Sequence, residues 1–319
     1  QARIYLKWPN TVNNKKLNEN TARQFAHLYN KGKTWSTGYV TRQQNKLLLV
    51  TNEDAGSHSL AQLNKYGVFS KVDILDDTQT YIAYFISLDA VKTNEVKAAL
   101  SQLFSENEVE RLLESDTPDN GSLKKVESEH GVAYFANTSC KGIIVLLDAN
   151  GVKQINSLIE AQTLSCYPQT VFDAIQIQSV HALVQGDAVA EYVPQMINVQ
   201  ALNGIDFDKG CYMGQEVVAR TRFLGKNKRA AYSFKLEGNV NVKPGDALEK
   251  QLGENWRIAG KILNVASLDN ETWFIAVLNN DTTSEDLHRL ADNNAITCYP
   301  NTLPYSIEQK ASNIVKKRR

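Results

Sequence analysis

Hydrophobic and polar positions follow two different patterns along this chain. In the first part, short apolar runs rich in branched and aromatic residues are typical of buried strands. Three such strands are expected, at residues 47–51, 80–88 and 142–147. Apolar residues at helical spacing predict three helices, over residues 59–69, 94–106 and 153–162. The polar segment before residue 44 and the charged segment 115–128 are expected to be irregular.

The second pattern begins near residue 235, where short strand candidates alternate with turn signals. The strands are expected at residues 231–236, 247–250, 257–268 and 272–278. Glycine, Pro-Gly and Asp-Asn pairs lie between them, and this regular spacing predicts a small antiparallel barrel. The chain is therefore expected to be an α+β protein. Its parts would be a body over residues 1–235, a barrel over 236–306 and a basic tail over 307–319.

Length and charge limit the classes of function. The chain has 319 residues, 42% of them hydrophobic, which is enough for about two domains. Lys+Arg and Asp+Glu number 35 each, so the net charge gives no general attraction to nucleic acid or to a membrane. A module that binds RNA directly is therefore disfavoured. No apolar run is long enough for a membrane helix and no signal pattern opens the chain, so a cytoplasmic location is expected.

Four widely spaced cysteines are a poor framework for disulfides or for a metal site. They are Cys140, Cys166, Cys211 and Cys298, with no CxxC pair among them. Reduced thiols in the cytoplasm fit this pattern better, and no metal is expected.

One segment concentrates the candidate chemistry, namely Lys209-Gly210-Cys211-Tyr212-Met213-Gly214-Gln215-Glu216. Good helix formers over residues 215–223 place Cys211 in a loop just before a helix N-terminus. The partial positive charge of that terminus and the nearby Lys209 favour the thiolate form. Arg220 would add charge if the helix folds back. The alternative is that Cys211 is an inert small hydrophobe and that Gln215-Glu216 is only a polar helix start.

This segment resembles the signature of the YgfZ family, which reads K-G-C-Y/F-x-G-Q-E followed by an arginine. Here Lys209, Gly210, Cys211, Tyr212, Gly214, Gln215, Glu216 and Arg220 agree with it. Residues 65–72, 192–204, 252–257 and 303–306 also look like the family. The family is related to the T-protein, the aminomethyltransferase of the glycine-cleavage system.

The resemblance implies a T-protein-like body of two interleaved α+β subdomains with a central folate-binding cavity, plus the barrel. It implies binding of tetrahydrofolate or a related folate. It also implies a role in the assembly or repair of iron–sulfur enzymes, such as the tRNA methylthiotransferases. Cys211, supported by Lys209, would be the functional thiol at the rim of a pterin-sized cavity. The residues implied for cofactor binding are Phe172, Gln178, Tyr212, Gln215, Glu216 and Arg220.

The chain departs from the family pattern on the folate side. Trp8-Pro9 replaces an early Gly-Gln pair, and Asn13 stands where the family has an acid. The D-x-K-G-K motif reads Tyr29-Asn30-Lys31-Gly32-Lys33 and lacks its acid as well. Phe172 takes the place of a Trp that can stack on a pterin, and Gln178 the place of a glutamate. Folate binding is therefore expected to be weakened or altered, with the cysteine function retained.

Two functions of different classes remain open. The first is the non-catalytic accessory factor just described, which acts through Cys211. The second is a folate-dependent one-carbon transferase of the aminomethyl type, which needs a positioned carboxylate. Asp206 and Asp208 are the carboxylates nearest to the signature.

Overall fold

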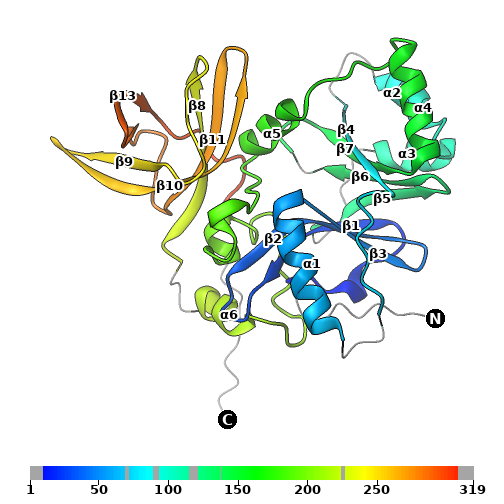
Figure 1. Ribbon diagram of the computed structural model, residues 1–319, viewed down its shortest axis with the longest axis horizontal. Coiled ribbons are helices and arrows are strands. Elements are labelled where there is room, and N and C mark those ends of the chain that lie inside the picture. Colours follow the sequence, from blue (N-terminus) through cyan, green and yellow to red (C-terminus); the bar gives the residue numbers. More distant parts are fainter. Residues whose placement is uncertain are drawn as a thin grey trace.

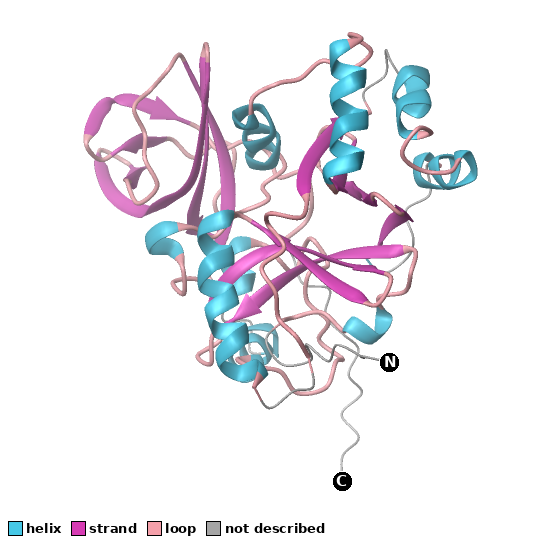
Figure 2. Ribbon diagram, turned by 45° about the vertical axis from the view of Figure 1, so that its right-hand side comes forward, coloured by secondary structure: helices cyan, strands magenta, loops and turns pink. Residues whose placement is uncertain are grey.

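The computed structural model describes residues 10–68, 72–88, 93–114, 121–136, 138–223 and 227–307. Figure 1 shows the arrangement: a body of sheet and helices occupies the centre and right, and a barrel of strands lies at the left. Figure 2 shows how helices flank the strands of the body. The expected basic tail lies outside the described residues from position 308 onward.

The body is built on one antiparallel sheet. Its spatial order is β3 (Lys46–Thr51), β2 (Thr34–Gln43), β1 (Thr21–Leu28), β5 (Leu123–Ser128), β6 (Gly131–Ala136), β7 (Gly142–Leu147) and β4 (Ile82–Ser87). Strand β1 pairs with β5 over only two residue positions, Thr21 with Lys124 and Ala22 with Leu123. The sheet therefore consists of two halves joined at a narrow seam.

Helices cover each half of the sheet. Helix α1 (Glu53–Gly67) packs on β2, and the side chain of Asn52 caps it by accepting a hydrogen bond from the Ala55 N–H. The other half carries α2 (Thr93–Leu100), α3 (Glu106–Leu113) and α4 (Ala149–Glu160). The apolar faces of these three helices form one core with β4–β7. The helix expected over 94–106 ends earlier, at Leu100, and after a turn Ser105 is the N-cap of α3.

The expectation of an irregular N-terminal segment is wrong, because residues 21–43 form β1 and β2. All eight side chains of β1 are buried, although half of them are polar. Arg23 pairs with Asp206, and His27 contacts the hydroxyl of Ser59. Partners from distant segments therefore hold Arg23 and His27, two of the polar side chains that made this strand look exposed. The loop expected over 115–128 is also wrong in part, since β5 occupies its end.

The C-terminal region confirms the predicted antiparallel barrel. Its strands run in the order β13 (Asn293–Cys298), β12 (His288–Leu290), β9 (Ala247–Leu252), β10 (Asn255–Leu268), β11 (Glu271–Asn279) and β8 (Arg229–Glu237). A bridge between Phe234 and Pro300 brings β8 against the chain that leaves β13. Inside the barrel, the rings of Phe234 and Phe274 stack on each other with 4.8 Å between their centroids. The expected boundary at residue 235 falls within β8.

The remaining helices connect the body to the barrel. They are α5 (Gln169–Gln178), α6 (Gln215–Phe223) and the short 3-10 helices η3 (Gly186–Ala188) and η4 (Pro194–Ile197), whereas the 3-10 helix η1 (Asn14–Lys16) precedes β1. Helix α5 packs on β10 and β11, and its Ala174 and Ile177 share a core with Leu263 and Ile275 of the barrel. Body and barrel therefore share one hydrophobic core.

Burial of His27 predicts a dependence of stability on pH. Burial lowers the pKa of His27 to about 4, below the ordinary value of 6.5. As pH falls below 6.5, the unfolded chain takes up the proton first, so the free energy of unfolding decreases until pH reaches about 4. The loss should amount to roughly 3 kcal/mol. Urea unfolding across this range checks it, and the His27→Gln variant should show a flatter profile. An equal slope in both proteins would contradict this assignment.

Candidate functional site

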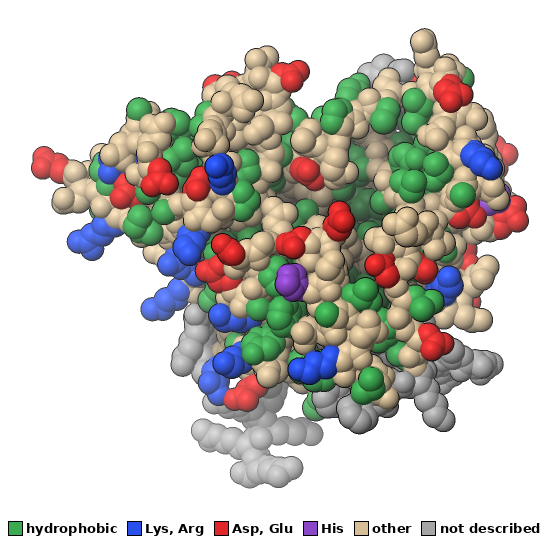
Figure 3. Space-filling model, in the orientation of Figure 1, with side chains coloured by type: hydrophobic (Ala, Val, Ile, Leu, Met, Phe, Trp, Pro, Cys, Tyr) green, Lys and Arg blue, Asp and Glu red, His purple; other side chains and the backbone are tan. Residues whose placement is uncertain are grey.

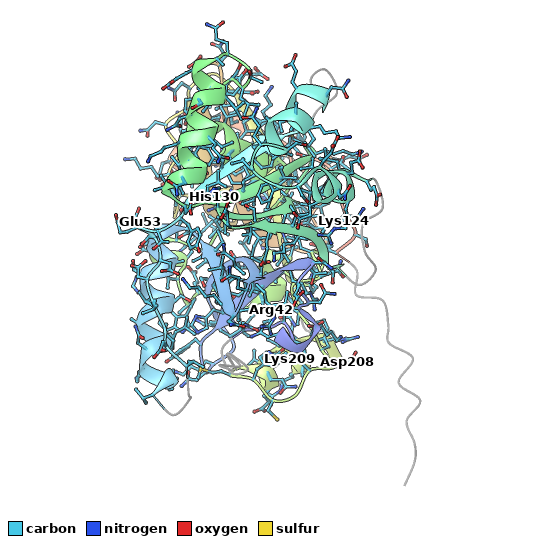
Figure 4. All side chains as sticks on the ribbon, turned by 90° about the vertical axis from the view of Figure 1, so that its right-hand side faces the viewer. Arg42, Glu53, Lys124, His130, Asp208 and Lys209 are labelled. Atoms are coloured by element: carbon cyan, nitrogen blue, oxygen red, sulfur yellow. The ribbon has the colours of Figure 1, made fainter. Side chains whose placement is uncertain are left out.

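The signature loop lies at the outer end of the body, before α6. Cys211 is exposed to solvent, four residues ahead of the first residue of α6. The helix occupies 215–223, as the sequence predicts. Figure 4 shows Asp208 and Lys209 side by side at the base of the molecule, on the same side as Arg42 of β2. Cys211 is thus presented outward and not enclosed in hydrocarbon.

Lys209 braces this loop from within. Only 6% of it is exposed, and its Nζ donates to the carbonyl oxygens of Asn10 at 2.6 Å and Val12 at 2.9 Å. The same ammonium lies 4.9 Å from the ring centroid of Tyr212. These contacts direct the charge toward the interior, whereas Cys211 faces solvent. Lys209 therefore holds the loop against the segment before β1.

Asp206 ties the loop to β1 through a largely buried ion pair. Its Oδ2 accepts from Arg23 Nη1 at 2.6 Å and from the Asn13 N–H at 2.6 Å. The side chains of Arg23 and Asp206 are 3% and 10% exposed. A carboxylate with these partners serves to position the chain. Asp208, the other carboxylate considered for catalysis, is exposed.

Two glycines allow the loop to sit against the turn between β1 and β2. Gly32 and Gly214 both have positive φ, at +75° and +76°. A Cβ on Gly214 would lie 2.6 Å from the Cα of Gly32 and 2.8 Å from the Tyr29 carbonyl oxygen. A Cβ on Gly32 would lie 2.5 Å from that of Val217. The motif at residues 29–33 and the cysteine signature therefore form one unit.

The other signature residues have mixed roles. Tyr212 is buried in the core that α6 shares with the barrel, and burial raises the pKa of its hydroxyl. The side chain of Gln215 accepts from the Tyr212 N–H at 3.3 Å and closes the turn before α6. Glu216 and Arg220 are exposed and pair with each other at 2.6 Å. Helix α6 does fold back on the loop, but through Arg222 and not through Arg220. The guanidinium carbon of Arg222 lies 4.0 Å from the centroid of the Phe207 ring.

A cavity of about 780 Å³ lies between β2, β4 and α5. Most of its wall is apolar or aromatic, with Tyr84, Phe85, Tyr167 and Phe172 among the lining residues. Figure 3 shows hydrophobic side chains gathered in a hollow in this part of the surface. The volume falls in the range of sites that take a small organic molecule.

Phe172 lines this cavity, as the sequence predicts, and its ring stacks on Phe85 at 4.7 Å. Gln178 is not among the lining residues: it is exposed, and its Oε1 accepts from Ser139 at 3.1 Å. Gln176, which sequence reasoning missed, lines the cavity instead. A signal for it existed, because Gln176 follows Phe172 by four positions and so shares its helix face.

The cavity and Cys211 are separate sites. None of the signature residues 209–216 lines the cavity, whose wall first meets β2 at Thr37. The loop instead contacts Gly32 in the turn before β2, five residues ahead of Thr37. The expectation that Cys211 lies at the cavity rim is therefore wrong. Two other cysteines, Cys140 and Cys166, line the cavity.

Neither a metal cluster nor a membrane helix stands out in the part of the chain that the structure describes. No group of three or more His, Cys, Asp or Glu side chains there is arranged to hold a metal ion. Among the described helices, none has both the length and the apolar character required to cross a membrane. Trp8 and Pro9, which replace the family's early Gly-Gln pair, lie outside the described residues.

The glycine contact predicts a specific sensitivity. Gly214→Ala introduces both an unfavourable φ and a clash with the backbone of the β1–β2 turn. The matched control is Gly238→Ala, which has a similar φ of +81° but open space around the new Cβ. Gly214→Ala should destabilise the protein by about 2 kcal/mol more than Gly238→Ala, the typical cost of overpacking. Urea unfolding measures both, and equal losses would show that the two segments do not pack as described.

Known proteins resemble this chain along most of its length. The family model "YgfZ, beta-barrel domain" matches residues 227–293. The tRNA-modifying protein YgfZ of Yersinia enterocolitica is 33% identical over 289 residues, covering 89% of this chain and 81% of that protein. The protein of the same name from Enterobacter sp. is 32% identical over 311 residues, covering 96% and 88%.

A solved structure shares the fold at low sequence identity. The crystal structure of glycine cleavage system aminomethyltransferase T from Bartonella henselae has a TM-score of 0.66 and 12% identity, covering 94% of this chain and 80% of that one. This likeness confirms the T-protein-like architecture that the sequence predicts. Because the Yersinia relative shares 33% identity over most of both chains, and the barrel fits the family's own domain, the chain belongs to the YgfZ family.

Proposed function

We propose that this chain is a folate-binding accessory factor of the cytoplasm that supports the assembly or repair of iron–sulfur enzymes and thereby tRNA modification. Its clients would be enzymes such as the tRNA methylthiotransferases. The observation that carries the proposal is the exposed Cys211 on a loop braced by buried polar contacts. The names of the relatives, tRNA-modifying proteins, support the link to tRNA.

The exposure of Cys211 favours action on a macromolecular partner. Iron–sulfur clusters usually need about four protein ligands, so a single thiol can hold one only together with another protein. A sulfur on the outer surface can reach such a partner, whereas a sulfur inside the cavity could serve only a small molecule. The bracing by Lys209 and Asp206 keeps the thiol in a fixed position, and this lowers the entropy cost of joint ligation.

The geometry gives the transferase alternative little support. Aminomethyl transfer requires a carboxylate close to the bound folate. Asp206 is occupied by Arg23 and by the Asn13 N–H, and Asp208 is exposed on the loop. Neither residue lines the cavity. We therefore assign Cys211 a role without folate turnover.

The cavity fits the folate part of the proposal. Phe172 and Phe85 offer a stacked aromatic wall for a flat ring, and buried carboxamides lie at the inner end. Asp173 is the one acidic or basic side chain among the described lining residues, so the cavity suits a neutral ring better than an anionic tail. When bound, a reduced folate would supply one-carbon or redox chemistry, and these residues would orient its ring.

Replacement of the thiol tests the proposal in cells. Cys211→Ala should reduce methylthiolated nucleosides in tRNA to the level of cells that lack the protein, as measured by mass spectrometry. Because the side chain is exposed, the free energy of unfolding should change by no more than about 0.5 kcal/mol.

The neighbouring variant Asp208→Asn separates the two functions. It should retain full methylthiolation if Cys211 acts as an accessory thiol. Normal methylthiolation in Cys211→Ala cells would refute the proposal, and loss only in Asp208→Asn cells would favour the transferase.

A further inference from the structure

A small recess opens from the inner end of the cavity. It has a volume of about 30 Å³, comparable to the share of liquid volume that one water molecule takes up. Recess and cavity share Thr37, Gly38, Tyr39, Gln176 and Leu183 in their walls, so they adjoin each other. A molecule in the cavity could therefore insert one polar edge into the recess.

Gln24 of β1 lines the recess with an unmatched polar group. The residue is 8% exposed, and its Nε2 lies 3.4 Å from the Tyr39 hydroxyl and 3.3 Å from Nδ1 of His181. Its buried Oε1 has no hydrogen-bond partner among the described residues. If the amide were turned by 180°, the NH₂ group would be the unmatched one instead. Either orientation leaves one half of the amide without a partner, which is costly in a buried position.

Gln176 of α5 presents a second buried amide at the same place. It is 7% exposed and lines both the recess and the cavity. Its side chain makes no hydrogen bond with any residue that the structure describes. It shares a helix face with Phe172, so a ring stacked on Phe172 would direct its edge toward Gln176.

The surroundings of the two amides are polar, and His181 is the one side chain among the described lining residues of the recess that can carry a positive charge. Among its described lining residues the recess has no Asp, Glu, Lys or Arg. Burial raises the pKa of Tyr39 to about 12, so its hydroxyl remains protonated at neutral pH. Such a site matches a neutral group that carries adjacent donors and acceptors, and its described lining residues offer a phosphate or a carboxylate no Lys or Arg.

We infer that Gln24 and Gln176 recognise the amide-bearing edge of a flat, neutral heterocycle that stacks on Phe172. The carboxamides would pair with the ring N–H and C=O, and the recess would accept only that edge. This inference rests on the proposed folate binding, since a reduced pterin carries such an edge. It assigns ring recognition to two residues that have no carboxylate, in place of the glutamate expected near position 178.

Calorimetric titration of purified full-length protein tests the inference with three probes. They are folinic acid, hydroxymethylpterin, which has no anionic tail, and a diaminopteridine, in which an amino group replaces the ring carbonyl. Gln176→Leu and Gln24→Leu should each weaken binding of the first two probes roughly tenfold or more, the loss expected when a buried hydrogen bond is removed. Both variants should also lose the preference of the wild type for hydroxymethylpterin over the diaminopteridine.

Gln154→Leu is the matched control. It also removes a glutamine whose Oε1 is buried and unmatched, but Gln154 lies outside the walls of the cavity and the recess. It should bind all probes as the wild type does. Gln24→Leu removes hydrogen bonds within the protein. If it fails to fold for that reason, Gln176→Leu, which removes none among the described residues, should still fold and still test the inference.

Wild-type affinities in both Gln24→Leu and Gln176→Leu would overturn the inference and leave a recess that holds only a structural water, with folate binding intact. Failure of the wild type to bind folinic acid and hydroxymethylpterin would overturn both this inference and the folate part of the proposed function.

Discussion

The anchoring of the signature loop is the interaction on which the rest of the site depends. The Lys209 ammonium donates to carbonyls of the segment before β1, and the Arg23–Asp206 pair joins the same loop to β1 itself. The contact between Gly32 and Gly214 then fixes the turn and the helix against each other. A thiol that is exposed yet held in place results from these three contacts, although none of them involves the sulfur.

Separation of the thiol from the cavity changes how the two sites can cooperate. Cys211 does not line the cavity, and its loop packs against the β1–β2 turn. Two strands link the sites: β2 lines the cavity at Thr37 and begins after that turn, and β1 carries both Arg23, which pairs with Asp206 of the loop, and Gln24, which lines the recess. In the proposed function, cavity and thiol would be two separate sites, one for a flat ring and one for a partner protein.

The sequence predicts best those parts that local pattern determines. Strand β7 and helix α6 have the predicted bounds, because an apolar run and a stretch of helix formers carry their own signal. Strand β1 was missed because its Arg23, Gln24 and His27 look exposed until their distant partners are known. The position of Cys211 relative to the cavity was also missed, because it depends on contacts between segments that lie far apart in the sequence. Phe172 was found by resemblance, while helix phase favours Gln176 over Gln178 as its neighbour in the cavity.

Alkylation of the cysteines, followed by mass spectrometry with and without saturating folinic acid, tests the central claim most directly. The account predicts that Cys211 reacts readily in the native protein and at the same rate in both samples. Cys140 and Cys166, which line the cavity, should become protected when the ligand is present. A Cys211 that resists alkylation, or that the ligand protects together with the other two, would contradict an outward-facing thiol separate from the cavity.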